Sequence, residues 1–264
     1  MRLAVVLRVL PLLSLLAGCA SKADETAASI PDATALPEGA TPAASSPSDG
    51  GADATDITDA SPTERDPVLF VHGIRSAGND FDVMMQRLSA LGWPADRLFA
   101  KTFPDPAWGC NVDNAKLVAD WAEAILKSTG AARLDVVAHS MGGLSSRRYM
   151  KTLGGAARVG TYVTIASMHH GLKEPCLSPL PVCVWQELCE KGAYLAELDV
   201  APTTPGPARW VSIYSVDDGT VPAASSKLLG AENIELGKIP HSGDGGLLES
   251  PLTIAEVARV LQYP

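Results

Sequence analysis

The chain has 264 residues, of which 46% are hydrophobic and 19% are charged, and its formal net charge is −9. This length suits one large domain or two small ones, and the apolar fraction is sufficient for a sizeable buried core. The acidic balance, with no long run of Lys and Arg, argues against a nucleic-acid-binding protein.

The first 19 residues have the features of an export signal. Arg2 and Arg8 give a charged start, residues 9–17 are apolar, and the segment ends in Leu-Ala-Gly-Cys at Cys19. The apolar stretch is too short for a permanent membrane span. Small residues directly before Cys19 match a bacterial lipobox, whose cysteine is lipidated; a plain signal peptide with a stray cysteine is the alternative. We expect an exported lipoprotein anchored at the cell envelope through Cys19, on the outer membrane if the host has one.

Residues 20–65 differ in composition from the rest of the chain. They are rich in Ala, Pro, Ser, Thr, Asp and Gly, with almost no large apolar side chain, so they cannot bury enough surface to offset chain entropy. We expect a disordered tether. It contains nine acidic and two basic residues and so carries about −7 of the net charge of −9. The acidity therefore describes the tether more than the domain expected at residues 66–264.

The domain begins with alternating strand and helix patterns. Residues 68–71 predict a buried strand, residues 79–90 a helix with apolar residues three and four apart, and residues 97–103 a second strand. After a loop, a long helix with an apolar stripe is expected from Asn111 until Gly130 ends it.

The next elements surround Ser140. Residues 133–138 predict a strand buried on both faces of a parallel sheet, and residues 144–153 predict a helix. Ser140 lies between them in the pattern Ala-His-Ser-Met-Gly, with Ala138 and Gly142 at the flanking small positions. Such a serine stands on a sharp turn that lifts its hydroxyl clear of the sheet. An accidental match in an ordinary loop is the alternative.

The remaining chain continues the alternation after one interruption. Strands are expected at 161–166, 210–215 and 233–236, a partly helical stretch at 221–229 and a last helix after residue 250. Residues 167–207 break the rhythm and predict an insertion near the mouth of the site, with one short helix at 194–198. The pattern predicts an α/β fold of the α/β-hydrolase type, a mostly parallel sheet of about six strands with helices on both faces.

The order of chemical groups along the chain suits nucleophilic catalysis. A serine hydroxyl needs a base within hydrogen-bond reach, and the base needs an orienting acid. This fold supplies them in the order serine, acid, histidine. Here Ser140 is followed by Asp217 or Asp218 and then by His241, each just past the carboxyl end of a predicted strand. Because these ends share one edge of the sheet, we expect the side chains to meet, with His241 as the base.

A tetrahedral intermediate would also need two backbone N–H donors. One is expected from Met141, directly after the nucleophile, and the other from the loop after the first strand, at Ile74 or alternatively Arg75. The other histidines are not expected to act as the base. His139 adjoins the serine, so its side chain should point elsewhere, and the pair at 169–170 precedes the acid and is interpreted as part of the rim of the site.

Four cysteines follow Cys19 in the chain. They are Cys110, Cys176, Cys183 and Cys189, and an even number in an exported chain predicts two disulfides. Three pairings are open. A zinc site is the alternative, but the paired Cys-x-x-Cys spacing is absent. We therefore expect no metal.

The domain resembles the small bacterial triacylglycerol lipases, the lipase class 2 group of the α/β-hydrolase superfamily. The matching pieces are Val-His-Gly-Ile at 71–74, Val-Ala-His-Ser-Met-Gly-Gly at 137–143, Ser-Ile-Tyr-Ser at 212–215 followed by Asp218, Leu-Leu-Gly-Ala-Glu-Asn at 228–233, and the loop with His241 and Gly-Leu-Leu at 246–248.

The resemblance implies Ser140 as nucleophile, Asp218 as acid in preference to Asp217, and His241 as base. It also implies the same oxyanion donors, Ile74 and Met141. Such enzymes act on carboxylic esters without a cofactor, so a lipid or another ester is the expected substrate, and we expect a monomer.

Two alternatives remain open at this point. The same fold could transfer an acyl group to another alcohol or cleave a polyester or thioester, and a surface domain with a vestigial pocket would bind without catalysis. Departures from the family pattern at 167–168 and 241–245 border the site, so the acyl-chain preference and any lid movement of the insertion stay open.

Overall fold

The computed structural model describes residues 65–262. The predicted leader, the lipidation site at Cys19 and all but the last residue of the predicted tether lie outside the described residues. Within residues 65–262, no helix has both the length and the apolar character that crossing a membrane requires.

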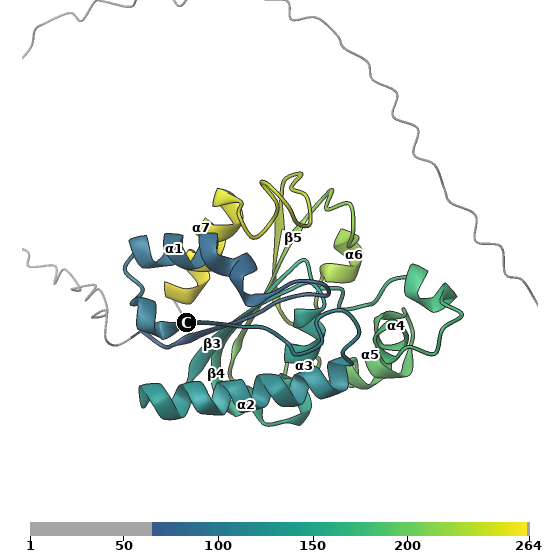
Figure 1. Cartoon of the computed structure of the whole chain (residues 1–264), viewed down its shortest axis with the longest axis horizontal. Coiled ribbons are helices and arrows are strands. Elements are labelled where there is room, and N and C mark those ends of the chain that lie inside the picture. The colour runs from purple at the N-terminus through teal and green to yellow at the C-terminus, as the bar shows by residue number, and fades with distance from the viewer. Residues whose placement is uncertain (1–64, 263–264) are drawn as a thin grey trace, which may run out of the picture. The chain divides into compact units, whose positions relative to one another are not determined.

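The described residues form one sheet of six parallel strands in the order β2-β1-β3-β4-β5-β6 (Figure 1). This arrangement confirms the predicted α/β fold with a parallel sheet. The strands are β1 (Val68–Val71), β2 (Leu98–Lys101), β3 (Leu134–His139), β4 (Val159–Ile165), β5 (Arg209–Ser215) and β6 (Glu232–Leu236).

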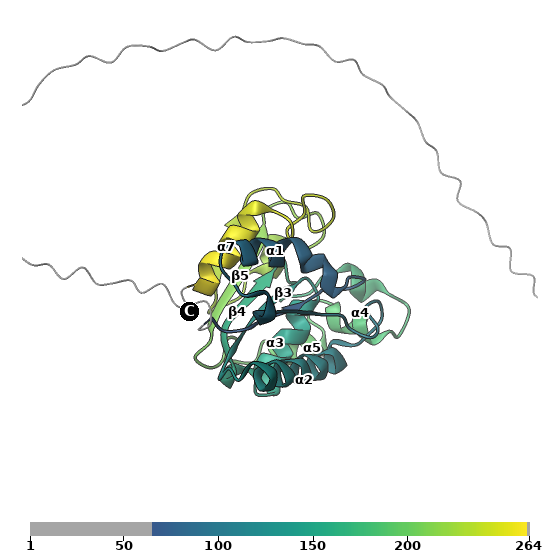
Figure 2. The ribbon, with the colours of Figure 1, turned by 60° about the vertical axis from the view of Figure 1, so that its left-hand side comes forward.

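Helices cover both faces of the sheet. Figures 1 and 2 show α1 and α7 on one face and α2 and α3 on the other. A short 3-10 turn (Gly78–Phe81) precedes α1, and α6 lies between β5 and β6. The helix bounds are α1 (Asp82–Ala90), α2 (Asn111–Thr129), α3 (Gly142–Thr152), α6 (Ala223–Ser226) and α7 (Pro251–Gln262).

Two layers of apolar side chains pack on the two faces of the sheet. Strand β3 shows the division, because Val137 packs in the layer under α1 and α7, whereas Val136 packs in the layer under α2 and α3. Burial on both faces explains why the central strands are continuous apolar runs rather than alternating ones. Both layers are made of residues that the structure describes.

Some element boundaries differ from the prediction. Strand β2 ends at Lys101, and soon afterwards the N–H of Phe103 donates a hydrogen bond to Nε2 of buried His72 at 2.9 Å instead of extending the sheet. Helix α3 begins at Gly142, two residues earlier than expected, because Leu144 already donates its N–H to the carbonyl oxygen of Met141 at 2.9 Å.

The insertion contains more helix than the sequence pattern predicts. Besides the expected short helix α5 (Ala193–Leu198), it forms a 3-10 turn (Glu174–Leu177) and α4 (Cys183–Leu188). Two disulfides brace it, which settles the pairing: Cys110–Cys183 ties it to the start of α2, and Cys176–Cys189 closes a loop within it.

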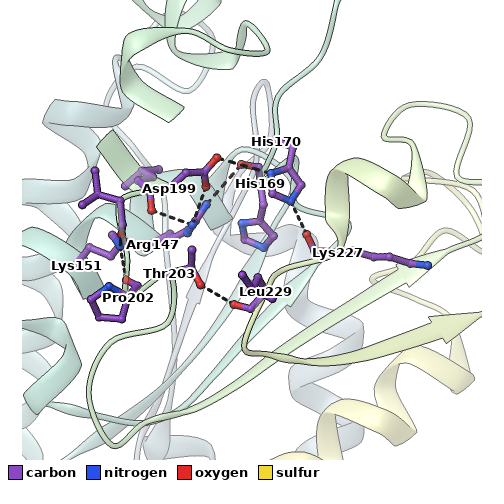
Figure 3. Close-up of polar contacts among 11 residues, drawn as sticks. Arg147, Lys151, His169, His170, Asp199, Pro202, Thr203, Lys227 and Leu229 are labelled. Carbon is purple, nitrogen blue, oxygen red and sulfur yellow. Dashed lines mark hydrogen bonds and ion pairs between the residues drawn. The ribbon is translucent and has the colours of Figure 1, made fainter. Parts of the chain in front are cut away.

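Polar contacts fix the end of the insertion onto α3 (Figure 3). Arg147 on α3 is fully buried and donates hydrogen bonds to the carbonyl oxygen of Leu198 at 2.9 Å and to the carboxylate of Asp199 at 3.0 Å. One turn later, Lys151 donates to the carbonyl oxygen of Pro202 at 2.6 Å. The insertion is therefore anchored to the helix that follows Ser140.

Candidate active site

Ser140 lies on the sharp turn between β3 and α3. Its φ is 55°, in the left-handed region that residues other than glycine rarely adopt. The turn is held because the N–H of Ser140 donates to the carbonyl oxygen of Ile165 on the neighbouring strand at 2.9 Å. Ser140 as a whole residue is 4% exposed. The strained turn predicted around this serine is thus present.

Close backbone packing explains the glycines around the turn. A Cβ on Gly142 would collide with the carbonyl oxygen of His72, and a Cβ on Gly73 would lie 2.7 Å from the Cβ of Ser140. Any side chain at either position would push the serine or its support out of place.

The structure brings Ser140, His241 and Asp218 together. His241, after β6, places Nε2 at 3.0 Å from the hydroxyl oxygen of Ser140 and Nδ1 at 2.8 Å from Oδ2 of Asp218. Because an ionised carboxylate only accepts, Nδ1 carries the proton and Nε2 is left to accept from the serine hydroxyl. Asp217 points elsewhere: it is exposed, and its carboxylate lies 3.4 Å from Nζ of Lys238.

The carboxylate of Asp218 is held in the charged form. Its Oδ1 accepts hydrogen bonds from the backbone N–H groups of Thr220 at 2.9 Å and Val221 at 2.6 Å. Burial by itself would raise the pKa of Asp218, but the hydrogen bond from His241 and those backbone donors outweigh it and lower the pKa below its ordinary value. The group opposite His241 therefore stays a carboxylate at neutral pH.

His139 is a component of the site that the sequence reasoning set aside. Its ring packs against that of His241, with 4.6 Å between centroids, and its Nε2–H donates to the backbone carbonyl oxygen of His241 at 3.2 Å. Burial and the neighbouring His241 lower the pKa of His139 to about 3, so it stays neutral. The alternation of side chains along a strand could have indicated this contact with His241. His139 lies on the same face of β3 as Val137, and the loop after β6, which carries His241, packs on that face.

The expected oxyanion donors flank the serine. Gly73 and Ile74 line the same cleft as Ser140, and Met141 lies at the N-terminal end of α3, where the helix dipole favours negative charge. The N–H of Arg75 is engaged with the carbonyl oxygen of Pro106 at 2.7 Å. This hydrogen bond leaves Ile74 rather than Arg75 as the candidate on that loop.

A family model described as Lipase (class 2) matches residues 65–237, which is more than half of the chain. The chain belongs to the class 2 lipases. Together with the fold, this makes the lipase a carboxylic ester hydrolase of the α/β-hydrolase type.

Several solved structures share the fold of the lipase at low sequence identity. The mature form of lipase BlEst2 from Bacillus licheniformis has a TM-score of 0.64 at 18% identity, over 75% of this chain and 92% of that one. Phospholipase PlaB from Legionella pneumophila has a TM-score of 0.63 at 14% identity, over 75% and 59% of the two chains. Esterase RhEst1 from Rhodococcus sp. has a TM-score of 0.51 at 15% identity, over 76% and 92%. These likenesses concern the fold alone.

Ser140 of the lipase lines a cleft of about 540 Å³. The insertion supplies much of an apolar wall, whereas the loops after β1, β5 and β6 supply polar side chains on the rest of the lining. The apolar wall consists of Ile74, Met168, Leu172, Pro175, Trp185, Leu188 and Leu248. The polar part includes Arg75, Asp80, Thr220, Asp244 and Glu249.

The His-His pair of the insertion is divided between core and surface. His169 is fully buried, with Nε2 at 3.0 Å from the hydroxyl of Thr164, so the prediction that it lies at the rim is wrong. Nε2 of exposed His170 donates to the carbonyl oxygen of Lys227 at 2.9 Å (Figure 3). Among residues 65–262, no cluster of three or more His, Cys, Asp or Glu side chains could hold a metal.

Proposed function

We propose that this lipase cleaves lipid or related carboxylic esters through Ser140, His241 and Asp218, with an acyl-enzyme intermediate. The observation that carries the proposal is the unbroken path of hydrogen bonds from the serine hydroxyl through His241 to Asp218, at 3.0 and 2.8 Å. These distances are within the reach that general-base catalysis requires.

In the first step, Nε2 of His241 takes the hydroxyl proton of Ser140 as the serine oxygen attacks the ester carbonyl carbon. The carbonyl oxygen becomes an oxyanion, which the N–H groups of Ile74 and Met141 would stabilise. Asp218, kept ionised by its hydrogen bonds, stabilises the imidazolium that forms.

In the second step, the imidazolium gives its proton to the leaving alkoxide oxygen, and the alcohol departs. Water then attacks the acyl-enzyme with the same histidine as base, and the acid product leaves as Ser140 regains its proton. His241 must keep one orientation through both steps. We propose His139 as a positioning residue, since it donates a hydrogen bond to the backbone carbonyl of His241 and packs against its ring.

The shape of the cleft supports an ester with an apolar acyl group. The wall that the insertion contributes is made of side chains such as Met168, Leu172 and Leu188, which would remove the acyl chain from water. The polar lining on the loops after β1 and β6 suits the more hydrophilic alcohol part.

We also propose that the lipase is an exported lipoprotein. In this proposal residues 1–19 are the leader, Cys19 carries the lipid, residues 20–65 are the tether, and residues 66–264 act as a monomer at the envelope. The lipobox-like end of the leader and the composition of the tether support it. Labelling of growing cells with a radioactive fatty acid should mark the wild-type chain and not Cys19→Ala.

The catalytic proposal is tested with p-nitrophenyl esters of increasing acyl length. Purified wild type should hydrolyse them, and His241→Ala should lose at least roughly 10³-fold in kcat. The matched control is His170→Ala, which alters an exposed histidine outside the cleft and should keep wild-type rates. Equal rates in wild type and His241→Ala would reject the proposed base.

A further inference from the structure

One segment of the insertion has an exposed surface without charge. Residues 175–189, here termed the wedge, contain one acidic and no basic side chain. The acid, Glu187, is buried and accepts the N–H groups of Asn111 and Val112 at the start of α2. Its exposed large apolar side chains are Leu177, which is 81% exposed, and Leu180, which is 59% exposed, and the uncharged Gln186 is exposed beside them.

The wedge is tied down on both sides of these leucines. The Cys176–Cys189 disulfide joins its two ends, and Cys110–Cys183 ties its middle to the start of α2. Glu187 adds hydrogen bonds to the same helix end. The two disulfides thus anchor both ends of the stretch 177–182, which carries the two leucines.

The apolar surface of the wedge continues into the active-site cleft. Pro175 and Trp185 line the cleft that contains Ser140 and also a neighbouring hollow formed with Leu180. Trp108, which is 46% exposed, packs edge-on against Trp185 with 6.5 Å between ring centroids. In Figures 1 and 2, α4 lies away from the C-terminal end of α7.

Charges at the base of the wedge cancel. Lys173 and Glu174 precede it, and Glu190 and Lys191 follow it. Because this surface has no excess of Lys and Arg to attract anionic lipid, it is better suited to a lipid surface without net charge. Residues 20–65 are a poor alternative occupant, because they have almost no large apolar side chain to place against the leucines.

We propose that the wedge inserts Leu177 and Leu180 into the surface of a zwitterionic lipid assembly and so brings the mouth of the cleft against its substrate. The inference rests on the proposed lipase function for its purpose, but the contact itself is hydrophobic and needs no catalysis. It therefore predicts a binding step that is separable from hydrolysis.

The test uses residues 20–264 with Ser140→Ala, so that neither the leader, a lipid on Cys19 nor hydrolysis contributes. Sedimentation with phosphatidylcholine vesicles measures partitioning. Adding Leu177→Asp with Leu180→Asp should lower partitioning by roughly 10-fold or more, because two exposed leucines no longer leave water. The matched control is Leu252→Asp at the start of α7, where the leucine is 60% exposed and partitioning should stay at its starting value.

Two further measurements sharpen the outcome. Partitioning should not fall when salt is raised, since the contact is not electrostatic. In the chain with Ser140 intact, the two aspartates should leave the hydrolysis of a water-soluble acetate ester unchanged and reduce that of vesicle-borne ester about as much as partitioning falls.

Three results would overturn the proposal: no partitioning of the parent chain, an equal loss in the Leu252→Asp control, or a dimer in sedimentation velocity that the two aspartates dissociate. The last result would assign the wedge to contact between copies. A chain that binds vesicles but hydrolyses nothing would reject the proposed catalysis and leave the docking inference standing.

Discussion

Replacing Asp135 with asparagine should change how the stability of the domain depends on pH. Asp135 is the second residue of β3, at the edge of the sheet opposite Ser140, and is 4% exposed. Burial raises the pKa of Asp135 to about 7, and the nearby carboxylate of Asp66 adds to this rise. The hydrogen bond from the N–H of Thr161, at 2.7 Å, acts in the opposite direction. The folded state thus holds a proton that the unfolded chain releases at much lower pH.

The sign of the effect follows from this difference. Between about pH 4 and pH 7 the folded state binds more protons at Asp135 than the unfolded state, so the free energy of unfolding falls as the pH rises. The loss is complete above about pH 7. A difference of about 3 pKa units at about 1.4 kcal/mol each gives roughly 4 kcal/mol as an upper bound, of which about 2 to 3 kcal/mol falls between pH 5 and pH 8.

The assay is urea unfolding of wild type and Asp135→Asn at pH 5 and pH 8. Asparagine keeps an oxygen that can accept from Thr161 and has no charge to desolvate. The stability of the variant relative to wild type should therefore rise by about 2 to 3 kcal/mol from pH 5 to pH 8. Other titrating groups cancel in this comparison, and ester hydrolysis should not change. A relative stability that is the same at both pH values would refute the reasoning.

Two further substitutions test the groups around His241. Asp218→Asn should lower kcat by on the order of 10³- to 10⁴-fold because the tautomer of His241 is no longer fixed, whereas Asp217→Asn should stay within about twofold; the reverse order would assign the acid to Asp217. His139→Phe keeps a ring beneath His241 but leaves its buried carbonyl without a donor, so kcat should fall by roughly 5- to 100-fold at unchanged KM. A loss of thermal stability with intact kcat would make His139 merely structural.

Much of the fold could be predicted because the sheet is buried on both faces. The runs that became β1 and β3 are apolar at nearly every position, and α2 extends from Asn111 to Thr129 with Gly130 after it at φ 70°. Strong local patterns of this kind leave few competing structures. Boundaries were less predictable where a tertiary contact decides them, as where Phe103 binds His72 instead of extending β2.

The insertion shows where local pattern is insufficient. Helix α4 has only six residues, fewer than a periodic pattern needs, and is held by its disulfide and by Glu187 rather than by propensity. The pairing of the four cysteines depends on which ones the fold brings within reach, which spacing along the chain does not determine.

The positions of the candidate site residues were predictable to different degrees. Ser140 and His241 follow from the turn pattern and from the shared edge of a parallel sheet. Asp217 and Asp218 are adjacent in the chain, so the sequence alone does not show which one faces His241. In the structure the N–H groups of Thr220 and Val221 orient the carboxylate of Asp218. His139 was missed because its role depends on a contact with His241, which lies about a hundred residues later in the chain.

The most direct measurement of the central claim is covalent labelling with a fluorophosphonate followed by mass-spectrometric mapping of the modified residue. Only a serine whose proton is removed by a positioned base reacts readily with this reagent. We predict a single modified residue, Ser140, in the folded lipase, with labelling lost in His241→Ala and in the unfolded chain. Modification elsewhere, or ester hydrolysis that continues with Ser140 unlabelled, would contradict the proposed mechanism.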